Sequence, residues 1–299
     1  AETPGWQNPF GYANLAVDDL LESQRLHRGS DRREVVAELQ RTVARTQPFT
    51  LLAFPDDVRA ARDDHYRNWS TTDLRSPRGY LTLERADRAE SVEDGASRRP
   101  SELVAVSTDR RVTENLNPLA VEFRRTGALT GLIYDSLGYV SDAGDATRWL
   151  ASSWAFSRDG AGIRARVTVR PDLRWHDGEP LTADDVAFTY TLFADTSLGR
   201  TGEDGPVPAP RFQGRSRLVD DVRAVDERTV EFRFADCTPP IATRAFTVPI
   251  LPEHVWRERS DPASVAGIEV GTATDALVTN NVPPVGSGPL RFVANTPGE

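Results

Sequence analysis

Apolar residues in the first fifty positions recur every three or four residues, which is the spacing of amphipathic helices. Asn14 is a suitable N-cap for a helix that runs to about Leu26, because its side chain can accept a hydrogen bond from the first turn. Asp31 and Glu34 have the spacing of a capping box and predict a second helix that ends near Thr46. The apolar stripe of this second helix consists of Val35, Val36, Leu39 and Val43.

Later segments have the alternation or the composition of strands. The run 49–54 is typical of a buried strand, and residues 164–169 alternate between polar and apolar side chains. Residues 222–234 predict a hairpin that turns near 226–228. The segment 128–140 is apolar enough for a helix packed on a sheet. Strands interspersed with helices indicate an α/β architecture.

The stretch RPDLRWHDGEPLTADDVAFTYTLF, residues 170–193, contains a complete set of local signals. Asp177 and the Gly after it predict a turn, and Thr182 with Asp185 has the spacing of a capping box. The helix that follows carries Val186, Tyr190 and Phe193 on one face. A strand, a turn and a capped helix account for nearly every residue, so a structural role is favoured. Adjacent residues seldom face one another productively, which argues against His176 and Asp177 as an acid–base pair.

The charge of the chain argues against a nucleic-acid partner. Its 299 residues carry a formal net charge of −9, from 45 acidic and 36 basic side chains. The basic residues are scattered among carboxylates, so no contiguous basic groove suits a phosphate backbone. No stretch approaches the roughly 18 consecutive apolar residues of a membrane span. Residues 1–10 lack the features of a signal peptide, so we expect that any export signal was removed or lies outside this chain.

Candidate catalytic and metal-binding residues are isolated from one another. The four His residues lie far apart in sequence and have no metal-ligand spacing. Cys237 is the single Cys and follows an alternating strand pattern, which favours a small buried thiol over a nucleophile. Ser287, in the GSG at 286–288, lacks the outer pattern of a nucleophile elbow. A hydrolase that uses Ser287 or His176 is therefore the less favoured interpretation.

Four regions carry a resemblance to a known family. The longest is LASSWAFSRDGAGIRARVTVRPDLRWHDGEPLTADDVAFTYTLF, and the others are ENLNPLAVEFRRTGALTGLIYDSLGYV, VPILPEHVW and VGSGPLRFVANTPGE. In the order in which they stand along the chain, they resemble the family 5 extracytoplasmic solute-binding proteins of ABC importers, the group that binds dipeptides, oligopeptides and nickel. In that family the WHDG turn belongs to the framework of the large lobe. This agrees with the structural role inferred from the residues themselves.

The order of segments departs from the family pattern. NPFGYANLAVDDLLESQRL and the segment 31–69 resemble the C-terminal end of the family, yet here they stand first. The beginning of the family pattern follows only near Leu103, after a charged, Gly- and Ser-containing linker. Three explanations fit this order: a circular permutant with the distal lobe excised, the junction of two tandem binding proteins, or a rearranged or incomplete form of a longer protein. The circular permutant is favoured, because surface termini that lie close together can be rejoined.

The resemblance implies an α/β, periplasmic-binding-protein-like (type II) large lobe with a mixed sheet and a second lobe that is largely absent. Residues 1–48 would be a helical segment resembling the end of the second lobe, and residues 49–85 the C-terminal return strand region of the large lobe. Residues 86–102 would be the linker and 103–285 the large lobe. Residues 286–299 would begin the crossover to the second lobe.

The resemblance also implies a function and a ligand. A peptide-like solute would bind in the cleft, the membrane permease of an ABC importer would be the partner, and the location would be extracytoplasmic. The full-length form would be peripheral to the membrane if it is lipid-anchored, and no cofactor or catalysis is implied. Asn115, Asn117 and Tyr134 match family segments at or behind the cleft. Turn formation before Pro118 is the alternative for the two Asn residues, and core packing for Tyr134. The alternative function is a lobe-only interaction or sensory scaffold.

Overall fold

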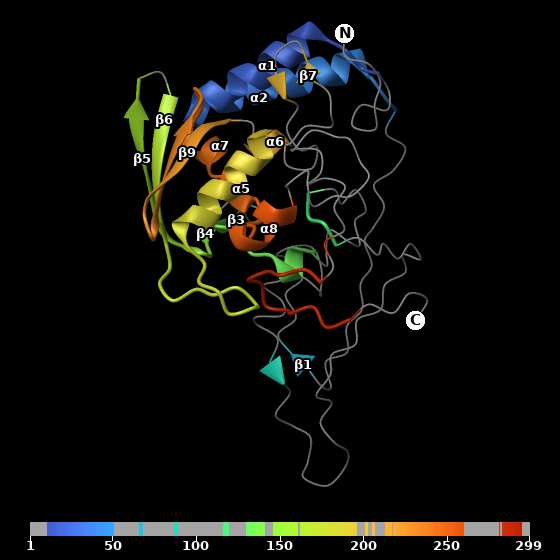
Figure 1. The fold of residues 1–299 in the computed structure, drawn as a ribbon. Helices are drawn as coiled ribbons and strands as arrows, with labels where there is room; N and C mark the ends of the chain where they lie inside the picture. The colour runs from blue at the N-terminus through green and yellow to red at the C-terminus, as the bar shows by residue number, and fades with distance from the viewer. Residues whose placement is uncertain are drawn as a thin grey trace.

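The chain forms a mixture of helices and strands (Figure 1). The computed structural model describes residues 11–50, 66–67, 87–88, 116–119, 130–140, 146–160, 162–195, 201–202, 205–206, 213–216, 218–259, 281 and 283–294. The described helices are α1 (Leu15–Leu26), α2 (Gly29–Thr46), α5 (Ala183–Asp195), α6 (Gln213–Ser216), α7 (Pro239–Ala242) and α8 (Glu253–Arg259), with the 3-10 helix η1 (Ala245–Thr247). The described strands are β1 (Tyr66–Arg67), β2 (Asp87–Arg88), β3 (Gly138–Val140), β4 (Ala146–Arg148), β5 (Ala151–Asp159), β6 (Gly162–Val169), β7 (Thr201–Gly202), β8 (Gly205–Pro206), β9 (Val219–Asp226) and β10 (Thr229–Phe234). The predicted α/β class is confirmed.

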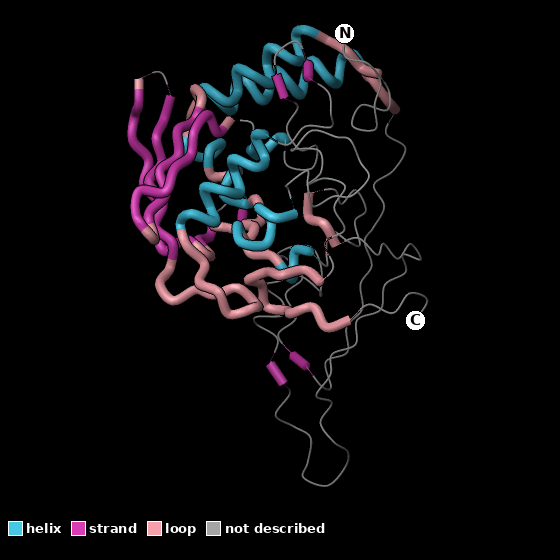
Figure 2. The backbone as a smooth tube through the Cα atoms, in the orientation of Figure 1, coloured by secondary structure: helices cyan, strands magenta, loops and turns pink. Residues whose placement is uncertain are grey.

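The largest described sheet has four strands in the order β5-β6-β10-β9, which lie side by side in Figure 2. In β6 and β10, Val167 lies opposite Val230 in antiparallel register. The hairpin predicted over 222–234 is confirmed, because β9 and β10 are adjacent strands joined by a short turn. The expected mixed sheet is not found among the described strands, all of whose pairs are antiparallel. The physical reason is that β5–β6 and β9–β10 are hairpins, which force antiparallel pairing.

One face of this sheet packs against α5 and forms the centre of the hydrophobic core. The buried apolar side chains of β6 and β10 are Ile163, Ala165, Val167, Val169, Val230, Phe232 and Phe234. The predicted apolar face of α5 is buried as well, and it consists of Val186, Tyr190 and Phe193. The Tyr190 ring meets the Phe232 ring edge-on with the centroids 4.9 Å apart. Its hydroxyl donates to the carbonyl oxygen of Ala245 at 2.7 Å, so this one side chain joins helix, sheet and η1.

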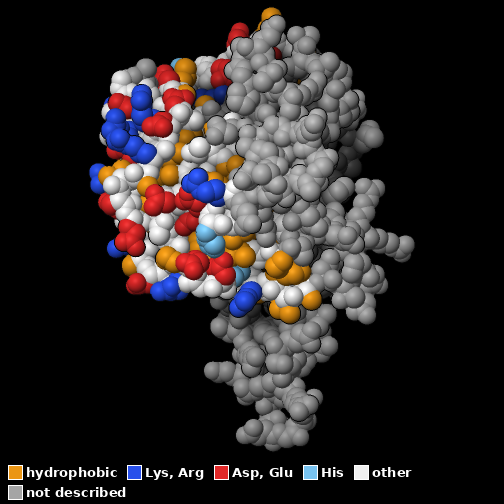
Figure 3. All heavy atoms as spheres, viewed as in Figure 1, with side chains coloured by type: hydrophobic (Ala, Val, Ile, Leu, Met, Phe, Trp, Pro, Cys, Tyr) orange, Lys and Arg blue, Asp and Glu red, His pale blue; other side chains and the backbone are white. Residues whose placement is uncertain are grey.

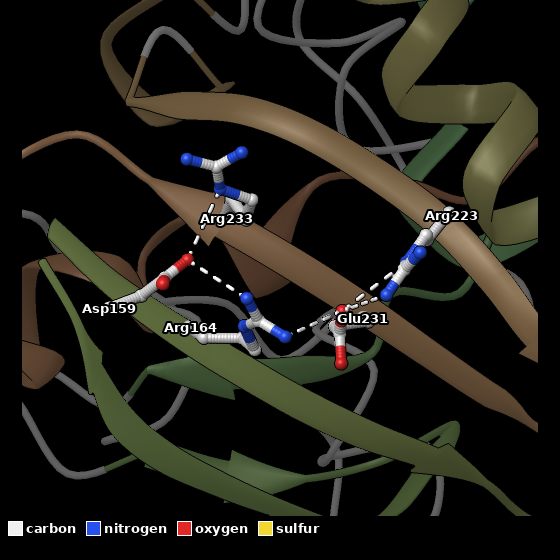
Figure 4. Close-up of polar contacts among 5 residues, drawn as sticks. All are labelled: Asp159, Arg164, Arg223, Glu231 and Arg233. Atoms are coloured by element: carbon white, nitrogen blue, oxygen red, sulfur yellow. Dashed lines mark hydrogen bonds and ion pairs between the residues drawn. The ribbon is translucent and has the colours of Figure 1, made fainter.

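The opposite face of the sheet carries charged side chains that are joined by ion pairs (Figure 4). Arg164 contacts Asp159 at 3.1 Å and Glu231 at 3.2 Å. Glu231 also pairs with Arg223 at 2.6 Å, and Asp159 with Arg233 at 3.2 Å. The hydrogen bond from Arg223 is the main cause of the lowered pKa of Glu231. On the face shown in Figure 3, basic and acidic side chains are interspersed in the same way. This face of the sheet is therefore a surface on which opposite charges are paired, with three arginines and two carboxylates in the network.

The two N-terminal helices form an antiparallel pair that lies side by side in Figure 1. The predicted N-cap of α1 is confirmed: Asn14 Oδ1 accepts from the backbone N–H of Ala16 at 3.0 Å and of Val17 at 3.3 Å. Val17 is the one buried residue of α1, and α2 has none. In the described part of the chain, no helix has both the length and the apolar character to cross a membrane.

The capping box predicted at the start of α2 is wrong, although the helix itself is present and ends at Thr46 as expected. The helix begins at Gly29, and the N-cap residue Arg28 makes no side-chain capping bond. Asp31 therefore lies inside the first turn, where its Oδ1 accepts from the hydroxyl of Ser30 at 3.1 Å. A carboxylate in the first turn still favours the helix, because it interacts with the positive end of the helix dipole.

The helix expected over 128–140 is wrong beyond its first turn. Residues 130–133 are helical, and the backbone N–H of Tyr134 donates to the carbonyl oxygen of Thr130 at 2.9 Å. The chain then becomes extended and pairs with β4 through β3. A Cβ on Gly138 would lie 2.7 Å from the carbonyl oxygen of Thr147, so only Gly permits this close approach.

Much of the predicted domain division falls outside the described residues. The run 49–54 is described only at its first two positions, and neither of them is in a strand. The rest of the predicted strand lies outside the described residues. Within 66–88, only β1 and β2 are described, and they pair with each other. The division of the chain into segments therefore stays a prediction.

Candidate functional site

Two of the three candidate ligand contacts lie in the described residues, and both are buried. Asn117 is 0% exposed, and its Oδ1 accepts from the backbone N–H of Leu119 at 2.8 Å. This bond is the local side-chain-to-backbone contact that makes Asn a turn former. Tyr134 is 2% exposed. Asn115 lies outside the described residues.

Asn281, which the sequence did not single out, joins these two candidates. Its Nδ2 donates to the carbonyl oxygen of Leu116 at 2.9 Å and to the hydroxyl of Tyr134 at 2.6 Å. The partners are 165 and 147 residues away in sequence. No periodicity or ligand spacing marks Asn281, so only the tertiary structure could identify it. A buried side chain of 0% exposure thus holds the loop of Asn117 beside Tyr134.

Asp135, the next residue along, anchors the same region to β3 and β4. Its carboxylate is 4% exposed, and Oδ1 accepts from Trp149 Nε1 at 3.1 Å and from the Tyr139 hydroxyl at 3.4 Å. The two aromatic rings meet edge-on with centroids 5.8 Å apart. The main-chain oxygen of Asp135 accepts from the backbone N–H of Ile250 at 2.8 Å. Asp135 therefore has a structural role in the described residues.

The GSG segment at 286–288 packs directly against the backbone that precedes Tyr134. The backbone N–H of Gly288 donates to the carbonyl oxygen of Ile133 at 2.8 Å, and that of Leu290 to Leu132 at 3.1 Å. A Cβ on Gly286 would lie 1.9 Å from the carbonyl oxygen of Ile133, which is far inside contact distance. The two glycines are therefore explained by close packing of two backbones, and not by a nucleophile elbow.

His176 of the WHDG turn clamps this same segment. Its backbone N–H donates to the carbonyl oxygen of Gly286 at 2.8 Å, and its ring Nε2 lies 2.8 Å from the carbonyl oxygen of Gly288. A carbonyl can only accept, so Nε2 carries a proton. Nδ1 is buried and has no hydrogen-bond partner. The turn therefore has the structural role that the sequence favoured, because it holds the segment 286–288 in place.

Asp185 caps two helices with one buried carboxylate. Oδ2 accepts from the backbone N–H of Thr182 at 2.9 Å, and the Thr182 hydroxyl accepts from the N–H of Asp184 at 3.3 Å, which confirms the predicted capping box. Oδ2 also accepts from Trp175 Nε1 at 3.3 Å, and Oδ1 from the N–H of Glu253, the first residue of α8, at 2.9 Å. Burial raises the pKa of Asp185 despite these bonds, because the charged form is desolvated.

Asp177 holds the tip of the turn against α8. Its Oδ2 lies 2.8 Å from Nε2 of His254, and its Oδ1 accepts from the backbone N–H of Glu179 at 3.2 Å. Partial burial by itself would raise the pKa of Asp177, but the hydrogen bonds from His254 and Glu179 make the net shift a lowering. Gly178 takes the left-handed conformation that the predicted turn requires, with φ of 100°.

The described residues do not assemble a catalytic group around the earlier candidates. The Ser287 hydroxyl is buried without a hydrogen-bond partner, and so is His176 Nδ1, so the two do not form a nucleophile–base pair. Burial is the main cause that raises the pKa of the Cys237 thiol to about 11, which leaves it protonated at neutral pH. Within the described ranges, no group of three or more His, Cys, Asp or Glu side chains could hold a metal ion.

The arrangement of the WHDG turn, α5, α8 and the GSG segment lies within the part of the chain that a family model matches. Residues 145–299, more than half of the chain, match the bacterial extracellular solute-binding proteins, family 5 middle region. The chain belongs to the family 5 solute-binding proteins. The resemblance inferred from the sequence motifs is therefore confirmed.

Individual relatives of this family 5 member match about three fifths of the chain. The YejA protein of Escherichia coli is 28% identical over 186 residues, which are 60% of this chain and 25% of that protein. A Brucella ovis protein named for peptide binding in an ABC transporter is 30% identical over 185 residues, 60% of this chain and 29% of that protein. The chain thus spans between a quarter and three tenths of the length of these curated relatives.

Solved structures give a similar range of coverage. The oligopeptide-binding protein AppA of Bacillus subtilis, in complex with a nonapeptide, is 22% identical with a TM-score of 0.45. The alignment covers 61% of this chain and 32% of AppA. Family 5 membership therefore rests on the sequence match to the family model.

Proposed function

We propose that this chain forms part of the binding site for a peptide-like solute that an ABC importer takes up. The match of residues 145–299 to the family of extracellular solute-binding proteins carries the proposal. The name of the Brucella ovis relative supports the peptide class of solute. Because the family consists of binding proteins, the proposed activity is binding without catalysis.

For contact with the solute we propose Asn115, Asn117 and Tyr134. Their match to family segments at or behind the cleft supports this choice, and the bonds from Asn281 support a common location for Asn117 and Tyr134. Both described candidates are buried among protein atoms. A solute that touches them must therefore replace some of the atoms now packed against them, whereas a purely positioning role needs no such replacement.

The proposed setting is extracytoplasmic, in the periplasm or at the cell surface, with the membrane permease of the importer as the partner. A lipid anchor would hold the full-length form at the membrane. The interspersed charges of the described surface in Figure 3 support a small solute over a nucleic acid, because phosphate backbones select contiguous basic surfaces.

We propose that the chain by itself binds peptides weakly. Small-ligand sites usually enclose roughly 70–90% of the ligand surface. One wall of a cleft would supply about half of that burial, while the entropic cost of association is nearly undiminished. A micromolar binder, with a binding free energy of about −8 kcal/mol, would therefore become millimolar or weaker.

Isothermal titration of the purified chain with a mixed di- to pentapeptide pool tests this proposal, with ligand-observed NMR to reach millimolar affinities. We expect a Kd in the millimolar range, weakened further by Tyr134→Phe and Asn117→Ala. Ser157→Ala, on the exposed face of β5, is the control and leaves binding unchanged. A Kd near or below micromolar would contradict the one-wall arrangement. No binding at millimolar peptide would favour the interaction or sensory scaffold.

We also propose that the segment order is that of a circular permutant with most of the second lobe removed. The resemblance of residues 8–69 to the end of the family, ahead of the family model's match at 145–299, supports this order. Intact mass and terminal sequencing of the natural protein test it. A longer protein with a second complete binding unit would instead show a junction of tandem proteins.

A further inference from the structure

The two edge strands of the main sheet differ in how they are protected from pairing with a further strand. Half of the residues of β9 are charged, and this strand contacts α5. In β5, at the outer edge of the sheet in Figure 1, Ser153, Ala155 and Ser157 are exposed and the charged residues come only at the end. Natural sheets usually blunt an exposed edge with charges, Pro, a bulge or a covering element. The bulge of β5 comes before Ser153, so residues 153–157, SWAFS, contain no charge, Pro or bulge.

Alternate residues of β5 direct their backbone N–H and carbonyl groups away from β6. In β6, the backbone N–H of Val169 donates to the carbonyl oxygen of Arg228, on the side of β10, at 2.8 Å. Successive residues of a strand bond to opposite neighbours, so the even-numbered residues of β6 bond to β5, where their partners include Ser153, Ala155 and Ser157. The residues of β5 that bond outward are Trp154, Phe156 and Arg158. In the described part of the chain, no strand pairs with the outer side of residues 154–158.

Residues 154–158, WAFSR, are complementary to a second copy of themselves. In an antiparallel pair centred on Phe156, the two Phe156 residues lie opposite each other, and Trp154 of each copy lies opposite Arg158 of the other. Residues that bond outward thus oppose each other, so the ladder of backbone hydrogen bonds can form. A guanidinium group is attracted to the face of an indole ring, and Arg148 of the same chain already lies 5.3 Å from the centroid of the Trp154 ring. The strand therefore supplies both members of each cross-strand pair that this register needs.

We propose that β5 is a dimerisation edge, at which two copies of this chain pair antiparallel around Phe156 and join their four-stranded sheets. Addition of a strand to a sheet edge is a general mode of protein association. An unrelated peptide would satisfy the same backbone groups, but it would not supply the pairs between Arg158 and Trp154. One strand pair buries less than the roughly 1,200 Å² of a stable interface, so the dimer is weak and reversible. The pairing uses none of the candidate solute contacts and does not rest on the proposed function.

Sedimentation equilibrium of the full chain at constant ionic strength, from about 10 µM to about 1 mM, tests the proposal. We expect the mass to rise with concentration from one chain towards two. Residue 155 of one copy faces residue 157 of the other, so Ala155→Glu with Ser157→Glu places like charges opposite each other, whereas Ala155→Glu with Ser157→Lys places opposite charges there. The second double variant should dimerise about 10-fold more tightly than the first. Val225→Glu, on the exposed surface of β9, is the control and dimerises like the unchanged chain.

Two further measurements separate a paired edge from a folding defect and from another mode of association. Residues 155 and 157 lie opposite Arg166 and Arg164 in β6, so the variant with two Glu residues should unfold at the same or a higher temperature than the unchanged chain. In hydrogen exchange measured by NMR, the amides of Trp154, Phe156 and Arg158 should slow as the monomer fraction falls, while the amides between them, already bonded to β6, should not change. A chain that stays monomeric at the highest concentration, or double variants that dimerise equally, overturns the proposal.

Discussion

The α1–α2 pair and α5, which packs on the main sheet, both start at a side-chain N-cap. The two regions differ in how many of their apolar side chains are buried. Asn14 caps α1 and Thr182 caps α5 with similar bonds. In α5 most apolar side chains are buried, and the helix contacts β9 and β10. In α1 and α2, Val17 is the one buried residue, while Leu15 and Leu26 are 82% and 51% exposed.

The difference shows that local signals start a helix but tertiary packing supplies most of its stability. Isolated helices are marginal in water, because nucleation is costly and each added residue contributes little. Contacts with the sheet stabilise α5 beyond what an isolated helix would have. Among the described elements, the main contacts of the α1–α2 pair are those between its own two helices. We therefore expect the two regions to respond differently to equivalent changes.

Removal of a large apolar side chain should give the largest difference between the regions. Phe232→Ala removes a fully buried ring that contacts Tyr190, Phe234 and Phe246, and should cost about 3–5 kcal/mol of the free energy of unfolding. Leu39→Ala in α2 removes a half-buried side chain and should cost about 1 kcal/mol. Urea unfolding monitored by far-UV circular dichroism measures both. Equal losses would show that the helical pair is as well packed as the sheet.

Asp185→Asn should have the next largest effect. The amide would offer one acceptor oxygen to three donors, from Thr182, Trp175 and Glu253, and would leave buried N–H groups unsatisfied. A loss of about 1–3 kcal/mol is expected. Asp31→Asn in the first turn of α2 is the control, because an exposed first-turn carboxylate contributes about 0.3–1 kcal/mol. If both changes cost the same, the carboxylate of Asp185 would not link α5 to α8 in solution.

The sequence predicted the local elements of the packed region well and its long-range contacts poorly. The capping box of Thr182 and Asp185 and the buried face of α5 followed from spacing alone, because cap and helix lie within a few residues. The bonds from His176 to Gly286 and Gly288 could not be predicted, since they join segments more than a hundred residues apart. The same holds for Asn281.

Errors in the sequence-based prediction arose where a local signal was outweighed by its surroundings. The capping box at Asp31 failed because the helix begins three residues earlier, with Arg28 as the N-cap residue and Gly29 as the first helical residue. The helix over 128–140 failed because Gly138 lets the chain approach β4 closely as a strand. Neither effect is visible from composition. The family resemblance was recoverable because its motifs are long and stand in a fixed order, and Asn115, Asn117 and Tyr134 stay candidates.

Removing the N-cap of α5 or of α1 should give a smaller difference between the two regions. Thr182→Ala should lower the free energy of unfolding by about 1 kcal/mol, because α5 unfolds together with the sheet. Asn14→Ala removes a similar bond, but we expect it to raise hydrogen exchange in residues 15–46 with little change in the main unfolding transition. Hydrogen exchange with mass spectrometry and urea unfolding separate the two results. A shift of the main transition by Asn14→Ala would mean that α1 and α2 belong to the same cooperative unit.

The smallest effect is an opposite pH response of two carboxylates that both attach to α8. The pKa of Asp177 is lowered from its usual 3.8 in the folded state, so its stabilising contribution is present above pH 3.8 and is lost as the pH falls below that value. The pKa of Asp185 is raised from 3.8, so folding is penalised where it is ionised, and stability is gained as the pH falls through the raised pKa towards 3.8. In urea unfolding between pH 7 and pH 3, Asp177→Asn should lose less stability than the unchanged chain below pH 3.8. Asp185→Asn should lack the gain above pH 3.8, and a response of both variants in the same direction would contradict the assigned roles.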